Sequence, residues 1–145
     1  GNIRNPGSRL VSSYEYRRQL LEVSPSSKAA KEMGFEQWVR TFVVRHLSST
    51  EFSPCVNMLK EDGKIIVSDV FFFEDLARSF EEIKANIRAR TGAVIDRNLP
   101  SSNRTEKPPW KSYYSSKWLV GFLTNQFLAD YEFAENVGKP YEVPE

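Results

Sequence analysis

The sequence predicts a mostly helical α/β domain with a few short strands. Three observations lead to this fold class. Four segments carry apolar residues at helical spacing, a short β-prone segment follows a turn signal, and the chain opens like a strand that turns into a helix. The 145 residues fit one domain of ordinary size. We therefore expect a single domain over 1–145, with 132–145 as a loosely ordered tail.

Composition excludes several classes of function. Twenty Lys and Arg residues oppose nineteen Asp and Glu, and this net charge of +1 gives no basis for general binding to nucleic acid or a membrane surface. The single cysteine, Cys55, cannot form a disulfide within the chain. With His46 as the only histidine, a zinc site is also disfavoured. No apolar run approaches the ~20 residues of a membrane-spanning helix, and we expect no metal.

The start of the chain predicts a capped helix with an anion site. Asn5 is a good N-cap and Pro6 suits the first helical position, so we expect a helix over 6–23. Free amides at a helix start attract anions, and Arg4 stands just before them. An arginine fork binds phosphate through two parallel charged hydrogen bonds. A solvated or ion-paired arginine is the alternative interpretation of Arg4.

Three more helices and one strand follow from apolar spacing. Helices are expected over about 35–47, 75–90 and 115–129. Asp62 and Gly63 predict a turn before a short strand over 64–67, whereas 28–33 is expected to be a loop or a short helical turn. The expected buried stripes are Phe35, Trp38, Val39, Phe42, Val43 and Leu47, then Leu76, Phe80, Ile83 and Ile87, and then Trp118, Leu119, Phe122, Leu123 and Phe127.

A long loop over 98–109 is the second candidate functional segment. Its prolines and turn formers exclude a helix, and loops of this length are commonly functional or disordered. Four basic residues in and beside it outnumber the acidic ones: Arg97, Arg104, Lys107 and Lys111. This local excess can embrace phosphate groups, but a solvated surface loop explains it equally well.

The segment Arg4-Asn5-Pro6-x-x-Arg9-Leu10-Val11-Ser12-x-Tyr14 closely resembles a motif of sulfotransferases, especially the carbohydrate or Golgi-type branch and its bacterial relatives. This resemblance implies part of a P-loop-like fold, in which the few short strands are parallel. It implies the sulfate donor 3′-phosphoadenosine 5′-phosphosulfate (PAPS) as co-substrate. It also implies that Arg4 and Ser12 hold the 3′-phosphate. Spacing alone does not bring them to one ligand, because Ser12 lies ~9 Å along the helix axis from its start.

Later segments extend the resemblance in the expected order. Val70, Phe73, Glu74 and Leu76 resemble a second signature, in which Glu74 is expected to be structural. The loop resembles the part of the family that closes over the nucleotide, which implies four further donor contacts: Asn103, Arg104, Thr105 and Lys107. Asp130-Tyr131-Glu132 resembles a motif near the C-terminal end of the domain in this family. One motif departs, since Glu51 and Cys55 replace the expected His and Gln.

The resemblance implies sulfuryl transfer from PAPS to a hydroxyl acceptor, for which a carbohydrate is the leading candidate. The family's 5′-phosphosulfate loop has no counterpart among these residues, so we expect a truncated domain whose catalytic residues lie upstream of residue 1. Such a fragment is expected to bind the 3′-phosphoadenosine part and to be inactive, which leaves its status as an enzyme open. A second copy of the chain is a candidate partner for the exposed sheet edge.

Two alternatives remain beside this interpretation. One is a non-enzymatic α/β interaction module whose basic loop is only a surface. The other is a kinase-like P-loop enzyme, which the missing glycine-rich Walker loop disfavours. The resemblance leaves the compartment open, since it implies the cytoplasm for a bacterial chain and the Golgi lumen for a eukaryotic one.

Overall fold

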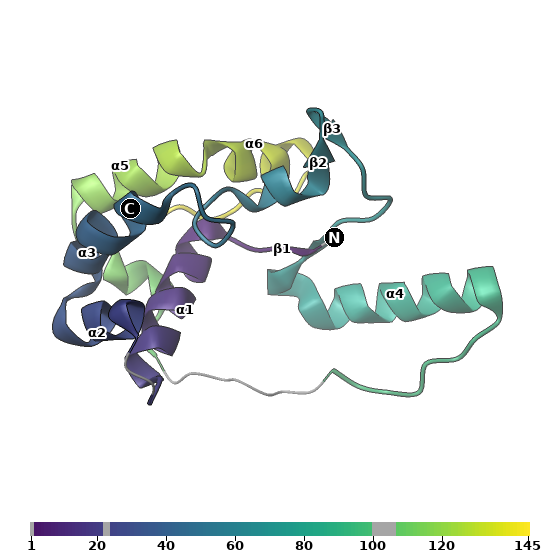
Figure 1. The fold of residues 1–145 in the computed structure, drawn as a ribbon. Coiled ribbons are helices and arrows are strands. Elements are labelled where there is room, and N and C mark those ends of the chain that lie inside the picture. Colours follow the sequence, from purple (N-terminus) through teal and green to yellow (C-terminus); the bar gives the residue numbers. More distant parts are fainter. Residues whose placement is uncertain (1, 22–23, 100–106) are drawn as a thin grey trace.

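Helices dominate the computed structural model, which describes residues 2–21, 24–99 and 107–145. The described α-helices are α1 (Pro6–Gln19), α2 (Pro25–Glu32), α3 (Phe35–Trp38), α4 (Leu76–Thr91), α5 (Lys117–Gln126) and α6 (Leu128–Asn136). Figure 1 shows α4 lying apart from the other helices, which pack together. This confirms the mostly helical α/β class predicted from the sequence.

The described strands form two short pairs. β1 (Asn2–Ile3) lies parallel to β4 (Phe71–Phe72), with Ile3 opposite Phe72. β2 (Lys60–Glu61) runs antiparallel to β3 (Lys64–Ile65). Asp62 and Gly63 join them with φ angles of 48° and 78°, so the turn predicted here is confirmed. The expected strand over 64–67 is shorter, however, and this second pair is antiparallel rather than parallel.

The start of α1 forms as predicted, but its end does not. The Asn5 side-chain oxygen accepts hydrogen bonds from the amides of Gly7 and Ser8 at 2.9 and 3.2 Å. Two of the open amides at the helix start are thereby satisfied. The helix stops at Gln19 instead of Val23, because Leu20 adopts an extended ψ of 129°.

Most of the segment expected to be a loop or short helical turn, residues 28–32, belongs to α2. Ser24 caps this helix by accepting from the amide of Ser27, whose hydroxyl oxygen in turn accepts from the Ser24 amide. Such a reciprocal capping box fixes a helix start without an apolar face to signal it. Of this helix, only Ser27 and Ala30 are buried.

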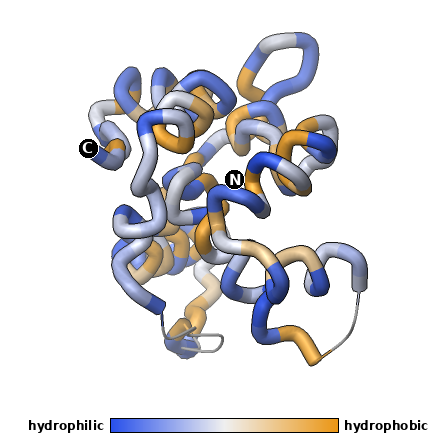
Figure 2. The backbone as a smooth tube through the Cα atoms, turned by 90° about the vertical axis from the view of Figure 1, so that its left-hand side faces the viewer, coloured by the Kyte–Doolittle hydropathy of each residue, from blue (hydrophilic) through white to orange (hydrophobic). Residues whose placement is uncertain are grey.

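The predicted helix over 35–47 forms in three parts. α3 continues into a π-helical turn at Val39–Val43 and a 3₁₀ turn at Val44–His46. Trp38, Val39 and Val43 are fully buried, and they share one core with buried residues of α1 and α5. Figure 2 shows hydrophobic and hydrophilic residues alternating along the helices, as expected for helices that bury one face.

Two expectations about the second half of the chain are wrong. The helix expected over 115–129 is divided, because α5 ends at Gln126 and α6 begins at Leu128. Residues 132–145, expected as a loose tail, contain the end of α6 with a fully buried Ala134. Beyond α6 the chain returns to the start of α1, where the carbonyl of Glu142 accepts from the Asn5 side chain at 2.9 Å.

The buried stripe expected on α4 is also wrong. Ser79 is the buried residue of this helix, while the predicted apolar stripe is only half-buried. Its C-terminus matches the prediction, since Gly92 takes the left-handed conformation with φ 72°.

Candidate functional site

Arg4 lies at the junction between β1 and α1, where its guanidinium follows the helix surface. Its Nη2 donates to the hydroxyl of Ser8 at 2.9 Å and to that of Ser12 at 2.7 Å. Residues four apart lie above one another on a helix, so Ser8 and Ser12 share the face along which Arg4 extends. The structure thus joins Arg4 and Ser12 directly.

Lys107 reaches the same hydroxyl from a distant part of the chain. Its Nζ donates to the Ser12 oxygen, although the two residues are 95 positions apart. Three of the residues expected to contact the donor, Arg4, Ser12 and Lys107, therefore meet at one point. The other three, Asn103, Arg104 and Thr105, lie outside the described residues.

The positive charges of Arg4 and Lys107, which meet at the Ser12 hydroxyl, are only weakly balanced by nearby negative charges. Burial lowers the pKa of Arg4, and burial followed by the nearby Arg4 charge lowers the pKa of Lys107. Glu74 and Glu15 act in the opposite direction at longer range. Within residues 2–21, 24–99 and 107–145, no ion pair includes Arg4 or Lys107. An anion bound here would relieve their mutual repulsion.

Sequence reasoning missed two side chains that orient Arg4. Ser8 accepts from both Nε and Nη2, at 3.2 and 2.9 Å. The Phe73 ring lies under the guanidinium, 4.4 Å from its carbon, in cation–π geometry. The four-residue spacing from Arg4 to Ser8 was a usable signal, whereas the Phe73 contact depends on how β4 packs beside β1.

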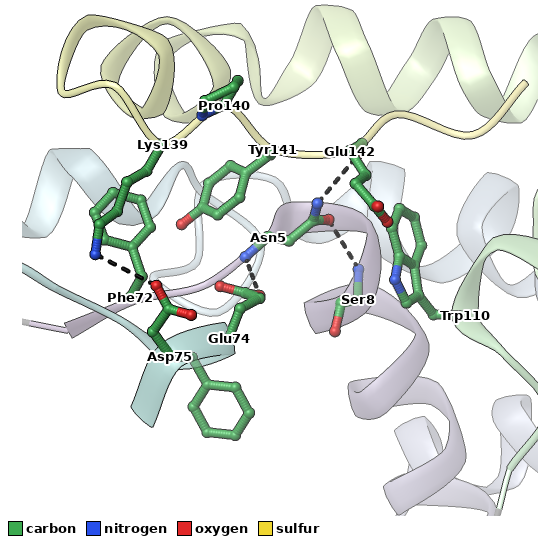
Figure 3. Close-up of a pocket in the computed structure, with 11 residues that line it drawn as sticks. Asn5, Ser8, Phe72, Glu74, Asp75, Trp110, Lys139, Pro140, Tyr141 and Glu142 are labelled. Atoms are coloured by element: carbon green, nitrogen blue, oxygen red, sulfur yellow. Dashed lines mark hydrogen bonds and ion pairs between the residues drawn. The ribbon is translucent and has the colours of Figure 1, made fainter. Parts of the chain in front are cut away.

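Glu74 has the structural role expected from the sequence. Its Oε1 accepts from the backbone amide of Asn5 at 2.9 Å, which links the end of β4 to the start of α1. Figure 3 shows this bond together with the Asn5–Glu142 bond around a cavity of about 650 Å³. The contacts of Asn5 thus fix the backbone next to Arg4.

A second cavity, of about 520 Å³, opens on the Arg4–Ser12 side of α1. Arg9 and Arg17 line it, but both have protein partners. Arg17 pairs with Glu51 at 2.6 Å, and Arg9 donates to the carbonyl of Ser53 at 2.7 Å. Of the cations lining this cavity, Arg4 is the one without a carboxylate or carbonyl partner among the described residues.

The two residues that depart from the family motif, Glu51 and Cys55, belong to this network. Glu51 also accepts from the Ser13 hydroxyl at 2.6 Å, and Arg9 contacts the Cys55 sulfur. Burial raises the pKa of the Cys55 thiol, which favours its protonated form. These residues connect the 51–55 segment to α1.

The described part of the chain contains no candidate metal centre. Across the described residues, no three His, Cys, Asp or Glu side chains converge in a way that would bind a metal. His46 is exposed at the end of the 35–46 helix, where its Nδ1 lies 2.7 Å from the Phe42 carbonyl oxygen.

None of the helices described has both the length and the apolarity to cross a membrane.

Comparisons of this chain with protein families, with curated proteins and with solved structures gave no match.

Proposed function

We propose that this chain binds the 3′-phosphate of adenosine 3′,5′-bisphosphate and PAPS through Arg4, Ser12 and Lys107. The observation that supports this most directly is the meeting at one serine hydroxyl of two cations that have no ion-pair partner among the described residues. One cation comes from residue 4 and the other from residue 107, so the arrangement belongs to the tertiary structure and not to one local motif.

The chemistry of the three groups suits a phosphate monoester. A guanidinium supplies a planar pair of donors, an ammonium supplies a compact charge, and a hydroxyl adds a neutral donor. A phosphate monoester carries close to two negative charges at neutral pH. It would therefore neutralise Arg4 and Lys107 together, and Ser12 would rotate its hydroxyl toward the ligand.

The wider function proposed is that of a sulfotransferase domain with a P-loop-like fold. In such an enzyme the acceptor hydroxyl, for which a carbohydrate is the leading candidate, attacks the sulfur of PAPS. A base near the acceptor and a cation near the leaving oxygen would lower the barrier. We assign neither group to a residue of this chain, and we assign Arg4, Ser12 and Lys107 to donor binding. Asn103, Arg104 and Thr105 are proposed as further donor contacts.

Calorimetric titration with adenosine 3′,5′-bisphosphate tests the proposal. Adenosine 5′-monophosphate and inorganic phosphate serve as comparison ligands. We expect the bisphosphate to bind at least about tenfold more tightly than the 5′-monophosphate, since hydrogen bonds from charged groups to its 3′-phosphate contribute about 1.5–3 kcal/mol. It should also bind more tightly than inorganic phosphate, which lacks the nucleoside. Arg4→Ala should abolish this preference. Arg78→Ala, a change at an exposed arginine on α4 that pairs with Glu82, is the matched control.

The possible outcomes separate the hypotheses. Equal binding of inorganic phosphate and the bisphosphate would show a general anion site and contradict the nucleotide assignment. Failure of all three ligands to bind would contradict the site itself and favour the interaction module.

A further inference from the structure

Residues 110–114 dock onto α1 through two tyrosine hydroxyls. The Tyr114 hydroxyl donates to the carbonyl oxygen of Gly7 at 3.1 Å. The Tyr113 hydroxyl donates to the carboxylate of Glu15 at 2.9 Å. These two hydrogen bonds lie at the two ends of the stretch of α1 that contains the candidate phosphate site, so they fix how this segment lies along the helix.

Lys107 is joined to the docked segment by two prolines, Pro108 and Pro109. Each proline has a fixed φ angle, and a residue that precedes a proline is held in extended conformations. The link between Lys107 and the docked segment is therefore short and stiff. The position in which the segment docks determines where the Lys107 ammonium can reach, and it contacts the hydroxyl of Ser12.

Glu15 lies beside this contact on the same helix. It follows Ser12 by three residues, and residues three apart are neighbours on a helix surface. Glu15 is buried, with 6% of its surface exposed, and its carboxylate also pairs with Arg18 at 3.0 Å. Burial lowers the pKa of Lys107, and the Glu15 charge acts against this effect. Glu15 is thus close to the ammonium without an ion pair between them.

We propose that Glu15 is a positioning residue for the 3′-phosphate site. By accepting the hydrogen bond from Tyr113, its carboxylate holds the docked segment in place and keeps the Lys107 ammonium at the Ser12 hydroxyl. This role rests on the proposed binding of the bisphosphate, although Glu15 is not one of the proposed ligand contacts. Its negative charge alone would repel a phosphate, so its contribution to binding is the hydrogen bond.

Two replacements separate the hydrogen bond from the charge. Glu15→Gln and Glu15→Ala both remove the charge, but only glutamine keeps an oxygen that can accept from Tyr113. In calorimetric titrations with adenosine 3′,5′-bisphosphate, Glu15→Ala should bind at least about threefold more weakly than Glu15→Gln, which is within the range for one lost hydrogen bond. Equal affinities of these two variants would overturn the proposal.

A double-mutant cycle tests whether the effect passes through Lys107. In a chain that also carries Lys107→Gln, the Glu15→Ala and Glu15→Gln variants should bind the bisphosphate equally, because there is no ammonium left to position. A difference that persists in this background would overturn the positioning role. Glu82→Ala and Glu82→Gln, at an exposed glutamate on α4, are the matched control pair and should bind alike.

Hydrogen exchange tests the docking without any ligand. The amides of Ser112 and Tyr114 donate to the carbonyl oxygens of Pro109 and Lys111 at 3.0 and 3.1 Å. These two amides should exchange faster in Glu15→Ala than in Glu15→Gln, because the segment then opens more often. Equal exchange in the two variants would contradict the role of Glu15.

The outcomes also distinguish this role from the function on which it rests. An unmodified chain that does not bind the bisphosphate would contradict the proposed function and the positioning role together. Binding by the unmodified chain, with no difference between Glu15→Ala and Glu15→Gln, would contradict the positioning role alone.

Discussion

The guanidinium of Arg4 donates a 2.7 Å hydrogen bond to the hydroxyl of Ser12, eight residues further along the chain. The arginine side chain spans two helical turns by passing Ser8, to which it also donates. Lys107 contacts the same Ser12 oxygen. A ligand that binds there would therefore meet donors already held in place, which limits the side-chain entropy lost on binding.

Replacement of Lys107 should separate ligand binding from stability. Burial and the Arg4 charge lower its pKa in the folded chain, so the folded state binds fewer protons than the unfolded state between that pKa and 10.5. Stability should therefore rise with pH in this interval, and the destabilisation is fully present at neutral pH. Without ligand, we expect the urea concentration at the unfolding midpoint of Lys107→Gln to be the same as that of the unmodified chain or higher. The affinity of this variant for the bisphosphate should fall.

Lys117→Gln is the control for this prediction, because Lys117 is exposed at the start of α5. Lys117→Gln should change neither the urea midpoint nor the affinity for the bisphosphate. A clear loss of stability in ligand-free Lys107→Gln would instead indicate that Lys107 has a structural role.

Asp130 should be essential for the stability of the fold. The residue is only 2% exposed, and its carboxylate accepts from the amides of Cys55 and Val56 at 2.9 and 2.8 Å. Asp130→Ala leaves both amides buried and unpaired, which should lower the free energy of unfolding by about 2–4 kcal/mol. Asp130→Asn keeps one acceptor and should lose less. Equal losses in urea titrations of the two variants would contradict this explanation.

Two glycines should respond in opposite directions to the same change. A Cβ added at Gly7 would lie 2.5 Å from the Trp110 ring and 3.1 Å from the Leu123 side chain. Gly7→Ala should therefore destabilise the chain by about 1–3 kcal/mol. Gly121, inside α5, has no atom within 4 Å of such a Cβ. There, Gly121→Ala should stabilise by up to about 1 kcal/mol through helix propensity. Thermal unfolding of both variants measures the difference.

Stability should fall in alkaline solution because of Tyr113. Burial and a 2.9 Å hydrogen bond to the Glu15 carboxylate raise the pKa of Tyr113 from 10.0 to about 12. Between these values the unfolded chain loses a proton that the folded chain keeps, so the free energy of unfolding decreases as pH rises. The decrease should be smaller in Tyr113→Phe, as measured by urea titration at pH values on both sides of this interval. An unchanged pH dependence in this variant would contradict the assignment.

Helix and turn signals that act over a few residues were predictable from the sequence. The caps at Asn5 and Gly92 and the turn at Asp62-Gly63 formed as expected, because each depends on neighbouring backbone groups. The division of the last predicted helix at Phe127 was not predictable, since the apolar pattern continues through it. Neither was the start of α2, where Ser24 acts as cap in a segment without apolar periodicity.

The candidate site was predictable only in part. Residue types and spacing indicated an anion site at Arg4, but the resemblance to sulfotransferases was needed to select Ser12 and Lys107. The contact between those two depends on tertiary packing across 95 positions, which no local pattern encodes. Phe73 was missed for the same reason, because it reaches Arg4 through the pairing of β4 with β1.

The contacts of Asn5 also set an order of events during protein synthesis. Its backbone amide binds Glu74, and its side chain binds the carbonyl of Glu142 while capping α1. A ribosome delivers the chain from its N-terminus, so residue 5 emerges long before these partners. The cap on α1 needs only neighbouring residues, but the full set of Asn5 contacts can form only after residue 142 has left the exit tunnel.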